Sequence, residues 1–485
     1  MLNFKDKKIV IMGLGLYGEG SGISATKFLI KRGAKVLVTD LKTKEQLKDQ
    51  IKRLGASAKK IEFVLGGHRE KDFKNADLIV RNPGVPKNSP YLKIARENNI
   101  PIENDISLFF QLVDRKRIIG ITGTRGKSTT ASLIYEIIKV VDKNAVLGGN
   151  ITKSPLAQMS EVKKGGAVVL ELSSWLIEEL EGHHLSPHIA VVTNIYPDHL
   201  NTYDGINDYA SAKENIWRWQ TRQDYVILNR DNKYTLAMGG RVPSQRFWFS
   251  LKKFKEENGC FLDGKNIIFR RDGKETNIMA VKDIKIIGEH NLANVLSAVC
   301  VAMIFGVAST IIKRAVKNFK GIADRLEFLR AVGGIKYYND TTSTTPEATI
   351  AALKALSCPP CPRGGGQRSG AKLAGGVGDF KKIVLIAGGA DKGLEFNQLV
   401  KEIKKYCKSV VLLNGTGTQR ILEKIKFAKV PMATVNSMTD AVGVARSFSK
   451  RGDIILLSPA FASFGIFINE FDRGEKFKKI ISRLK

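Results

Sequence analysis

An α/β fold divided into three domains is what this sequence predicts, and two patterns indicate it. Short apolar strands alternate with helical segments along most of the 485 residues, which is the pattern of parallel sheets covered by helices. Two of those strands run directly into glycine-rich turns that are each followed by a helix, an arrangement typical of nucleotide-binding domains. A chain of this length also exceeds what a single hydrophobic core usually holds.

The first predicted domain covers residues 1–112 and opens with a Rossmann-like βαβ unit. An apolar strand at 9–12 leads through a glycine-rich turn and a helix to a second strand at 35–39, which ends in Asp40. Glycines let the backbone approach a diphosphate, and the helix N-terminus offers partial positive charge. We expect this turn to bind a diphosphate and Asp40 to hold a ribose or uracil edge. NAD is the alternative ligand, although residues 19–22 stretch the usual fingerprint.

The central predicted domain, residues 113–321, resembles a P-loop ATPase-type parallel sheet and contains a stronger phosphate-binding signature. The loop follows an apolar strand at 118–121 and precedes a helix. In such a loop the backbone N–H groups cradle phosphates, a lysine reaches the β and γ oxygens, and a hydroxyl reaches Mg²⁺. The spacing is not that of the general Walker A pattern, because Ile121 stands where its first glycine would be. We expect ATP to contact Gly123, Thr124, Arg125, Gly126, Lys127, Ser128 and Thr129.

Three further residues of this domain have side chains that suit a metal site. Glu171 ends an apolar strand, and a carboxylate there, beside a phosphate loop, is placed to hold Mg²⁺, or else it is a charge at a helix N-terminus. His199 follows the next strand and is either a second metal ligand or a packed surface residue. Lys213 lies in a predicted helix, where a lysine by itself is an ordinary solvated charge.

The third predicted domain, residues 322–485, is again Rossmann-like, with alternating helices and strands. Residues 357–379 are rich in glycine and proline, so we predict a flexible insertion there. The insertion holds Cys358 and Cys361, but no second cysteine pair or histidine pair nearby completes a zinc set. We therefore expect no metal at these cysteines.

Composition limits the partners. The 78 lysines and arginines exceed the 47 aspartates and glutamates and leave a net charge of +31. Such an excess can attract nucleic acid or polyanionic substrates, or can simply solvate the surface. The lysines are scattered and not interleaved with aromatic residues, so we expect no nucleic-acid partner. Because no long apolar run or signal-peptide core occurs, we expect a cytoplasmic protein without membrane insertion. We also expect a monomer.

The phosphate loop, Glu171, His199, Lys213 and the segment at 290–294 follow one another in an order that resembles the Mur ligase family, which also includes folylpolyglutamate synthases. Five separate motifs carry the resemblance, which covers essentially the whole chain. In that family the N-terminal domain binds a UDP moiety, the central domain binds ATP, and the C-terminal domain binds the incoming amino acid. The resemblance implies that the UDP-linked substrate meets Gly13, Gly15, Leu16, Gly18, Asp40, Asn82, Gly84 and Asn150.

The resemblance also implies the reaction and its ions. ATP would phosphorylate a substrate carboxylate, and an amine would then attack the acyl phosphate, with cations neutralising the charge. Lys213 would be carbamylated by CO₂, which turns an ammonium into an anion that can support magnesium. The catalytic residues would be Lys127, His199 and Lys213, and two Mg²⁺ ions would be held by Ser128, Glu171, His199 and Lys213. Further ATP contacts would come from Asn291, Asn294, Arg325 and Asp340.

The end of the chain resembles the branch of this family that adds D-glutamate to UDP-N-acetylmuramoyl-L-alanine in peptidoglycan synthesis. The segments 457–464 and 469–474 carry that likeness, and Ser463 matches a serine that contacts the glutamate side chain. The branch usually has Asp-Ser-Lys-Ala-Thr before this point, whereas here Thr342 replaces the lysine and Thr344 keeps the threonine. A hydroxyl can bind a carboxylate but supplies no charge. The expected glutamate contacts are therefore Thr342, Thr344 and Ser463, and L-glutamate, another amino acid or a folylpolyglutamate-type reaction stays the alternative.

Overall fold

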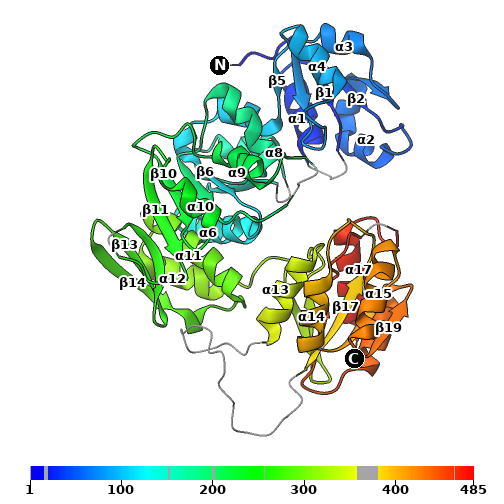
Figure 1. The fold of residues 1–485 in the computed structure, drawn as a ribbon. Coiled ribbons are helices and arrows are strands. Elements are labelled where there is room, and N and C mark those ends of the chain that lie inside the picture. The colour runs from blue at the N-terminus through cyan, green and yellow to red at the C-terminus, as the bar shows by residue number, and fades with distance from the viewer. Residues whose placement is uncertain are drawn as a thin grey trace. The chain divides into compact units, whose positions relative to one another are not determined.

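The computed structural model describes residues 2–15, 20–150, 153–198, 202–255, 257–357, 381–463 and 465–484. They form three sheets with helices packed against them, and the predicted α/β class is confirmed (Figure 1). The chain divides into two compact units, one of residues 1–279 and 293–316 and the other of residues 280–292 and 317–485. The predicted boundaries at 112 and 321 stay predictions. Among the described residues no helix combines the length and the apolar character that crossing a membrane requires.

The first sheet is parallel and has the strand order β3-β2-β1-β4-β5. Its middle strand β1 (Lys8–Met12) is almost wholly buried, as expected of a strand covered on both faces. The helix α1 (Ser21–Lys31) makes the crossover to β2 (Lys35–Asp40). The remaining elements are α2 (Lys48–Leu54), η1 (Gly55–Lys60), β3 (Ile61–Leu65), α3 (Glu70–Lys74), β4 (Leu78–Arg81), α4 (Pro90–Glu97) and β5 (Ile102–Glu103).

The second sheet has nine strands in the order β14-β13-β12-β11-β10-β9-β6-β8-β7. Its strand β6 (Ile118–Thr122) lies between β8 (Val168–Glu171) and β9 (Ile189–Val192), parallel to both. The other strands are β7 (Val146–Gly149), β10 (Tyr225–Asn229), β11 (Gln245–Ser250), β12 (Gly259–Asp263), β13 (Asn266–Arg271) and β14 (Lys274–Ala280). The associated helices are η2 (Arg115–Arg117), α6 (Lys127–Val141), η3 (Pro155–Gln158), α7 (Met159–Val162), α8 (Ser174–Ile177), η4 (Glu178–His183), α9 (Ile206–Glu214), α10 (Lys233–Met238), η5 (Val281–Asp283), α11 (Glu289–Ile304) and α12 (Ser309–Asn318).

The third sheet has the order β15-β16-β20-β17-β18-β19, in which only the edge strand β15 pairs antiparallel. Its elements are β15 (Glu327–Val332), β16 (Ile335–Asn339), α13 (Pro346–Ser357), β17 (Ile383–Gly388), α14 (Asn397–Tyr406), β18 (Cys407–Leu413), α15 (Thr416–Phe427), β19 (Met432–Val435), α16 (Met438–Ser447), β20 (Ile454–Leu457) and α17 (Glu470–Arg483). The predicted insertion, with its two cysteines, lies outside the described residues except for its first position, Ser357.

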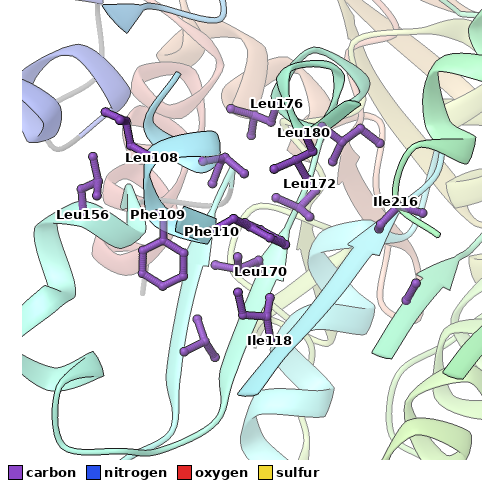
Figure 2. Close-up of a cluster of buried hydrophobic side chains, with 14 of the residues drawn as sticks. Leu108, Phe109, Phe110, Ile118, Leu156, Leu170, Leu172, Leu176, Leu180 and Ile216 are labelled. Atoms are coloured by element: carbon purple, nitrogen blue, oxygen red, sulfur yellow. The ribbon is translucent and has the colours of Figure 1, made fainter. Parts of the chain in front are cut away.

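The helix α5 (Asp105–Leu112) joins the first sheet to the second through a shared core. Asn104 caps it, because its Oδ1 accepts hydrogen bonds from Ile106 N at 2.9 Å and Ser107 N at 2.8 Å. Figure 2 shows side chains of α5, among them Phe109, lying beside leucines and isoleucines of the second sheet and its helices. Burying one such phenyl ring contributes about 2–3 kcal/mol. The first two sheets therefore belong to one compact unit.

Candidate functional site

The loop between β6 and α6 has a backbone that only glycine can follow at two places. Gly123 has φ of +138° and Gly126 has φ of +84°. A Cβ on Gly123 would collide with Thr193 Oγ1, and a Cβ on Gly126 would collide with Asn294 Oδ1. The loop leads directly into the N-terminus of α6. The backbone N–H groups and the dipole of a helix N-terminus favour a bound anion. The loop therefore has the form of a phosphate cradle.

Lys127 lies over this cradle. Its Nζ donates hydrogen bonds to the carbonyl oxygens of Gly123 at 2.9 Å and Thr124 at 3.1 Å. These two carbonyl oxygens hold the ammonium at the loop, where a bound phosphate would meet its positive charge. Ser128 follows in the first turn of α6 and is buried. The described members of the predicted phosphate set therefore share one loop and one helix start.

Asn194, to which the sequence analysis gave no role, holds the loop in place through hydrogen bonds. Asn194 follows β9; its Oδ1 accepts from Arg125 N at 2.9 Å, and its Nδ2 donates to Arg125 O at 3.0 Å. Thr193 Oγ1 donates to the same carbonyl at 2.7 Å. Thr130 Oγ1 also lies 3.4 Å from the amide oxygen of Asn294, which packs against the loop from α11. Asn194 could have been suspected, because it ends a strand adjacent to β6.

Glu171 ends β8 opposite Ile121 of β6, and it is 2% exposed. Its Oε1 accepts from Asn150 Nδ2 at 3.4 Å, whereas its Oε2 is buried and has no hydrogen-bond partner among the described residues. A buried carboxylate oxygen without a donor is costly unless a cation pairs with it. This orphaned oxygen fits a hard cation such as Mg²⁺. The hydrogen bond to Oε1 places Asn150, which is predicted to contact the UDP-linked substrate, beside Glu171, the predicted metal ligand.

Lys213 projects from α9 and is 1% exposed. Burial holds the pKa of its ammonium well below the usual range, and the positive charge of Lys127 lowers that pKa further. The carboxylates of Asp198, Glu178 and Glu171 act in the opposite direction. The structure thus brings Lys127, Glu171 and Lys213 into one electrostatic neighbourhood, which is what the sequence argument required of them.

The other predicted metal ligand, His199, lies outside the described residues. Within the described part of the chain, no three or more His, Cys, Asp or Glu side chains gather as a metal-binding group. Of those residue types the predicted set contributes only Glu171 to the described residues, since Ser128 supplies a hydroxyl and Lys213 an amine. The pair of Mg²⁺ ions therefore stays a prediction, supported by the orphaned oxygen of Glu171.

The glycine-rich turn after β1 is organised by a carboxylate. Asp40 Oδ2 accepts from Leu14 N at 2.9 Å, and its Oδ1 accepts from Lys42 N at 3.0 Å. Asn82 lies against the turn: a Cβ on Gly13 would come within 3.1 Å of its Cβ, and a Cβ on Gly15 within 3.0 Å of its Nδ2. The amide oxygen of Asn82 also accepts from Gly84 N at 3.0 Å. The described substrate candidates of this domain therefore meet in one place, while Leu16 and Gly18 lie outside the described residues.

In the second unit Asp340 follows β16 and is buried. Its carboxylate accepts from Leu326 N at 3.0 Å and from the hydroxyls of Ser343 and Ser458. Burial raises its pKa to about 6. The neighbouring Arg325 is exposed, and the Nδ2 of Asn291 donates to Ile287 O at 2.8 Å. These predicted ATP contacts thus lie in the second compact unit, whereas Asn294 lies in the first.

The predicted glutamate contacts include one residue turned inward and one with an unexpected cation beside it. Thr342 Oγ1 donates to Asp324 O at 2.9 Å. Thr344 Oγ1 accepts from Lys392 Nζ at 3.0 Å. Lys392 belongs to a third glycine-rich turn, after β17, which sequence reasoning did not single out although it has the same strand-end position. Ser463 is buried and follows Ala462, which pairs with the backbone of the same turn.

A buried arginine connects these segments. Arg473 is 0% exposed; its Nε donates to Thr341 Oγ1 at 3.1 Å and its NH2 to Thr341 O at 2.8 Å. Its NH1 donates to Phe461 O at 3.4 Å. Burial lowers the pKa of the guanidinium to about 10, so it stays charged at neutral pH. Arg473 therefore ties the segment before Thr342 to the segment before Ser463.

Comparisons with known proteins find relatives that match nearly the whole chain. A family model described as the Mur ligase middle domain matches residues 121–302, and one described as the Mur ligase MurD-like N-terminal domain matches residues 7–104. The UDP-N-acetylmuramoylalanine--D-glutamate ligase of Roseiflexus sp. (strain RS-1) is 39% identical over 98% of this chain and 98% of its own length. The enzyme of that name from Alkaliphilus metalliredigens is 33% identical over 100% of both.

Solved structures share the fold. The UDP-N-acetylmuramate-alanine ligase MurC of Thermotoga maritima has a TM-score of 0.61 at 20% identity and covers 98% of this chain and 99% of its own. The MurF of Acinetobacter baumannii has a TM-score of 0.59 at 15% identity, with 98% and 93% covered. At such identities the likeness concerns the fold alone. The two family models and the full-length relatives go further: this chain belongs to the Mur ligase family.

Proposed function

We propose that this chain is an ATP-dependent ligase that joins D-glutamate to the alanyl carboxyl group of UDP-N-acetylmuramoyl-L-alanine in peptidoglycan biosynthesis. The observation that carries the proposal is the agreement, along nearly the whole chain, with relatives of that name that are 32–39% identical. The phosphate cradle beside Glu171 and Lys213 supports the same reaction. We expect the enzyme to act in the cytoplasm as a monomer, in three domains with boundaries at about 112 and 321.

The reaction has two balanced steps. The alanyl carboxylate takes the γ-phosphoryl group of ATP, which releases ADP and leaves an acyl phosphate. The glutamate amine then attacks the acyl carbon, loses a proton and displaces phosphate. Lys127 and the N–H groups of its loop hold the negative oxygens, and when Mg²⁺ is bound it supplies further charge neutralisation. Ser128, Glu171, His199 and Lys213 would hold the ions.

Lys213 is expected to work as a carbamate. Its neutral amine nitrogen bonds to the carbon of CO₂ and then loses a proton, which gives an anion. The surroundings favour the first step, because the lowered pKa of Lys213 increases the fraction of its amine that is unprotonated. The anion would then face the positive charge of Lys127. Labelling with ¹³C-bicarbonate should give a carbamate carbon signal in the wild type that is missing in Lys213→Ala, and an identical spectrum in both proteins would contradict this assignment.

The charge that Thr342 lacks can come from Lys392. Thr342 uses its hydroxyl on Asp324 O, so it is poorly placed to receive a carboxylate. Lys392 brings an ammonium to Thr344 from the neighbouring turn. We infer that Thr344, Ser463 and Lys392 receive the carboxylates of glutamate. Lys392→Met should then raise the KM for glutamate about tenfold or more, since an ionic hydrogen bond is lost.

Phosphate release with defined substrates tests the function. We expect release only when UDP-N-acetylmuramoyl-L-alanine and D-glutamate are both present with ATP and Mg²⁺. L-glutamate and a panel of other amino acids measure the alternative that the Thr342 departure leaves open, and a folate acceptor measures the folylpolyglutamate-type reaction. Strong preference for another amino acid or acceptor would overturn the proposal.

A further inference from the structure

Arg81 ends β4 and is one of the largest fully buried side chains among the described residues. A buried arginine needs a structural reason, since the residue is rarely buried unless paired. One reason is local. Its NH1 donates to Val85 O at 2.9 Å and so closes the turn of residues 82–85. That turn carries Asn82, which lies against Gly13 and Gly15 of the first glycine-rich turn.

The other end of the guanidinium contacts η4, a helix associated with the second sheet. Its NH2 lies 2.8 Å from Glu179 Oε1 and 4.0 Å from Glu178 Oε2. Lys87, just beyond the same turn, adds an ion pair of 2.9 Å to Glu178 Oε2. Both glutamates begin η4, which continues the segment that starts at Glu171. Two cations beside the substrate turn therefore pair with two carboxylates that follow the predicted metal ligand in sequence.

From Glu178 the contacts continue to the catalytic lysine. Tyr203 OH donates to Glu178 Oε1 at 2.7 Å. The rings of Tyr203 and Tyr209 have centroids 5.2 Å apart, and Lys213 Nζ lies 4.5 Å from the centroid of Tyr209. Each of these residues except Lys87 is largely buried, so the contacts form a packed path and not a set of mobile surface pairs.

We propose that Arg81 is a positioning residue that couples the two ends of this path: it fixes the 82–85 turn for the UDP-linked substrate and holds Glu178 and Tyr203 beside Lys213. The inference rests on the proposed function, because it takes the first glycine-rich turn as the substrate site. The physical basis is the cost of removing the guanidinium from Glu179, its hydrogen-bonded partner, and its positive charge from Glu178, which keeps only Lys87 and Tyr203 of the contacts described above. A side chain that donates to Val85 O and to Glu179 at once, 4.0 Å from a second carboxylate, has few alternative conformations.

The test compares Arg81→Met and Arg81→Lys with the wild type in full steady-state kinetics. Methionine keeps much of the apolar stem but donates nothing, and lysine keeps the charge but cannot reach both ends. For Arg81→Met we expect the KM for UDP-N-acetylmuramoyl-L-alanine to rise about tenfold and kcat to fall about tenfold, with the KM values for ATP and glutamate within about twofold. Arg81→Lys should recover kcat in part and leave the KM raised.

A matched control separates positioning from general stability. Arg115 forms a comparable ion pair of 2.9 Å with the buried Asp224 in the same unit. Arg115→Met should lower Tm and leave all three KM values near those of the wild type. Glu179→Gln should raise the KM for the UDP-linked substrate in the wild type but add less than about twofold in Arg81→Met, because the two residues act through one contact.

The outcomes are distinct. If Arg81→Met lowers Tm as Arg115→Met does, and its three KM values all change by the same factor or not at all, the coupling role is overturned and the proposed function stands. Should the wild type itself release no phosphate with the UDP-linked substrate, the proposed function is overturned, and the coupling inference with it. A selective rise of the one KM, with the nonadditive Glu179→Gln effect, supports the inference.

Discussion

Two glycine-rich turns in the first unit have the same local plan and different chemistry. Each follows a buried parallel strand and precedes a helix, and each uses glycines with positive φ. The turn after β1 is tied down by a carboxylate, Asp40, which accepts from Leu14 N. The turn after β6 is tied down by a cation, Lys127, which donates to Gly123 O. We infer that similar local geometry can make two anion sites, and that the anchoring residue decides which step each site can serve.

The difference is physically sensible. The phosphates of a UDP-linked substrate stay intact, so backbone donors and a helix N-terminus suffice to position them. The γ-phosphoryl group of ATP is transferred, and charge must be stabilised as it moves. For that reason we expect the turn after β6 to need a side-chain ammonium, that of Lys127, to stabilise the transferred charge. The following variants test whether the two anchors divide the work in this way.

The largest effect is expected from Lys127→Met. Removing the ammonium should reduce kcat by about a thousandfold, because a donor aimed at the transferred charge is lost. Binding of UDP-N-acetylmuramoyl-L-alanine should stay within about twofold of the wild type in calorimetric titration. Lys139→Met is the control on the same helix, since its amine donates to Lys143 O and Ala145 O at the far end. Turnover within tenfold of the wild type would remove Lys127 from the mechanism.

The fold around the two turns could be predicted from the sequence, because the signal there is local. Strand, turn and helix follow from apolar runs and glycines. Glu171 was singled out by its strand-end position, and the likeness to a known family gave Lys213 its expected role. Three sets of hydrogen bonds were not predicted from the sequence: those of Asn194 to Arg125, of Arg473 to Thr341 and Phe461, and of Lys392 to Thr344. The contacts of Asn194, Lys392 and Thr341 join residues 48 or more positions apart, so no periodicity or spacing reports them. Arg473 and Phe461 are 12 positions apart. At Thr342 the sequence showed that a threonine replaces the usual lysine, but it could not predict the hydrogen bond that turns this side chain inward, to Asp324 O.

The next effect tests the glycine that shapes the second turn. Alanine at Gly126 must adopt positive φ, which costs about 1–2 kcal/mol, and its Cβ must displace Asn294. We expect kcat/KM for ATP to fall about twentyfold, while the KM for the UDP-linked substrate stays unchanged. Gly33→Ala has a similar φ of +83° after α1, but the atom nearest its Cβ is Cγ of Lys5, at the ordinary contact distance of 3.4 Å. It should lower Tm alone, and an equal loss of ATP kinetics in both variants would show that backbone strain, and not the cradle, is responsible.

A smaller effect is expected at the anchor of the first turn. Asp40→Asn keeps one oxygen acceptor and loses the other, so either Leu14 N or Lys42 N is left without its partner. The KM for the UDP-linked substrate should rise about fivefold, the equivalent of about 1 kcal/mol, with ATP kinetics unchanged. Asp77→Asn offers a control, because Asp77 accepts from Lys8 N at 2.8 Å at the other end of β1. If Asp40→Asn instead impairs ATP, the two turns are not independent.

The smallest effect concerns a third anchor of the same kind, in the second unit. Asp340 also follows a strand and accepts from a leucine N–H, but it is fully buried, so its pKa rises from 3.8 in the reference state to about 6. An acid with a raised folded pKa contributes stability that is complete below the unfolded pKa and is lost as pH rises through the folded one. The free energy of unfolding should therefore fall by about 1 kcal/mol more in the wild type than in Asp340→Asn between about pH 5 and about pH 8. Urea unfolding at both pH values measures the difference, and parallel losses would mean that the carboxylate of Asp340 is as well solvated as that of an exposed anchor.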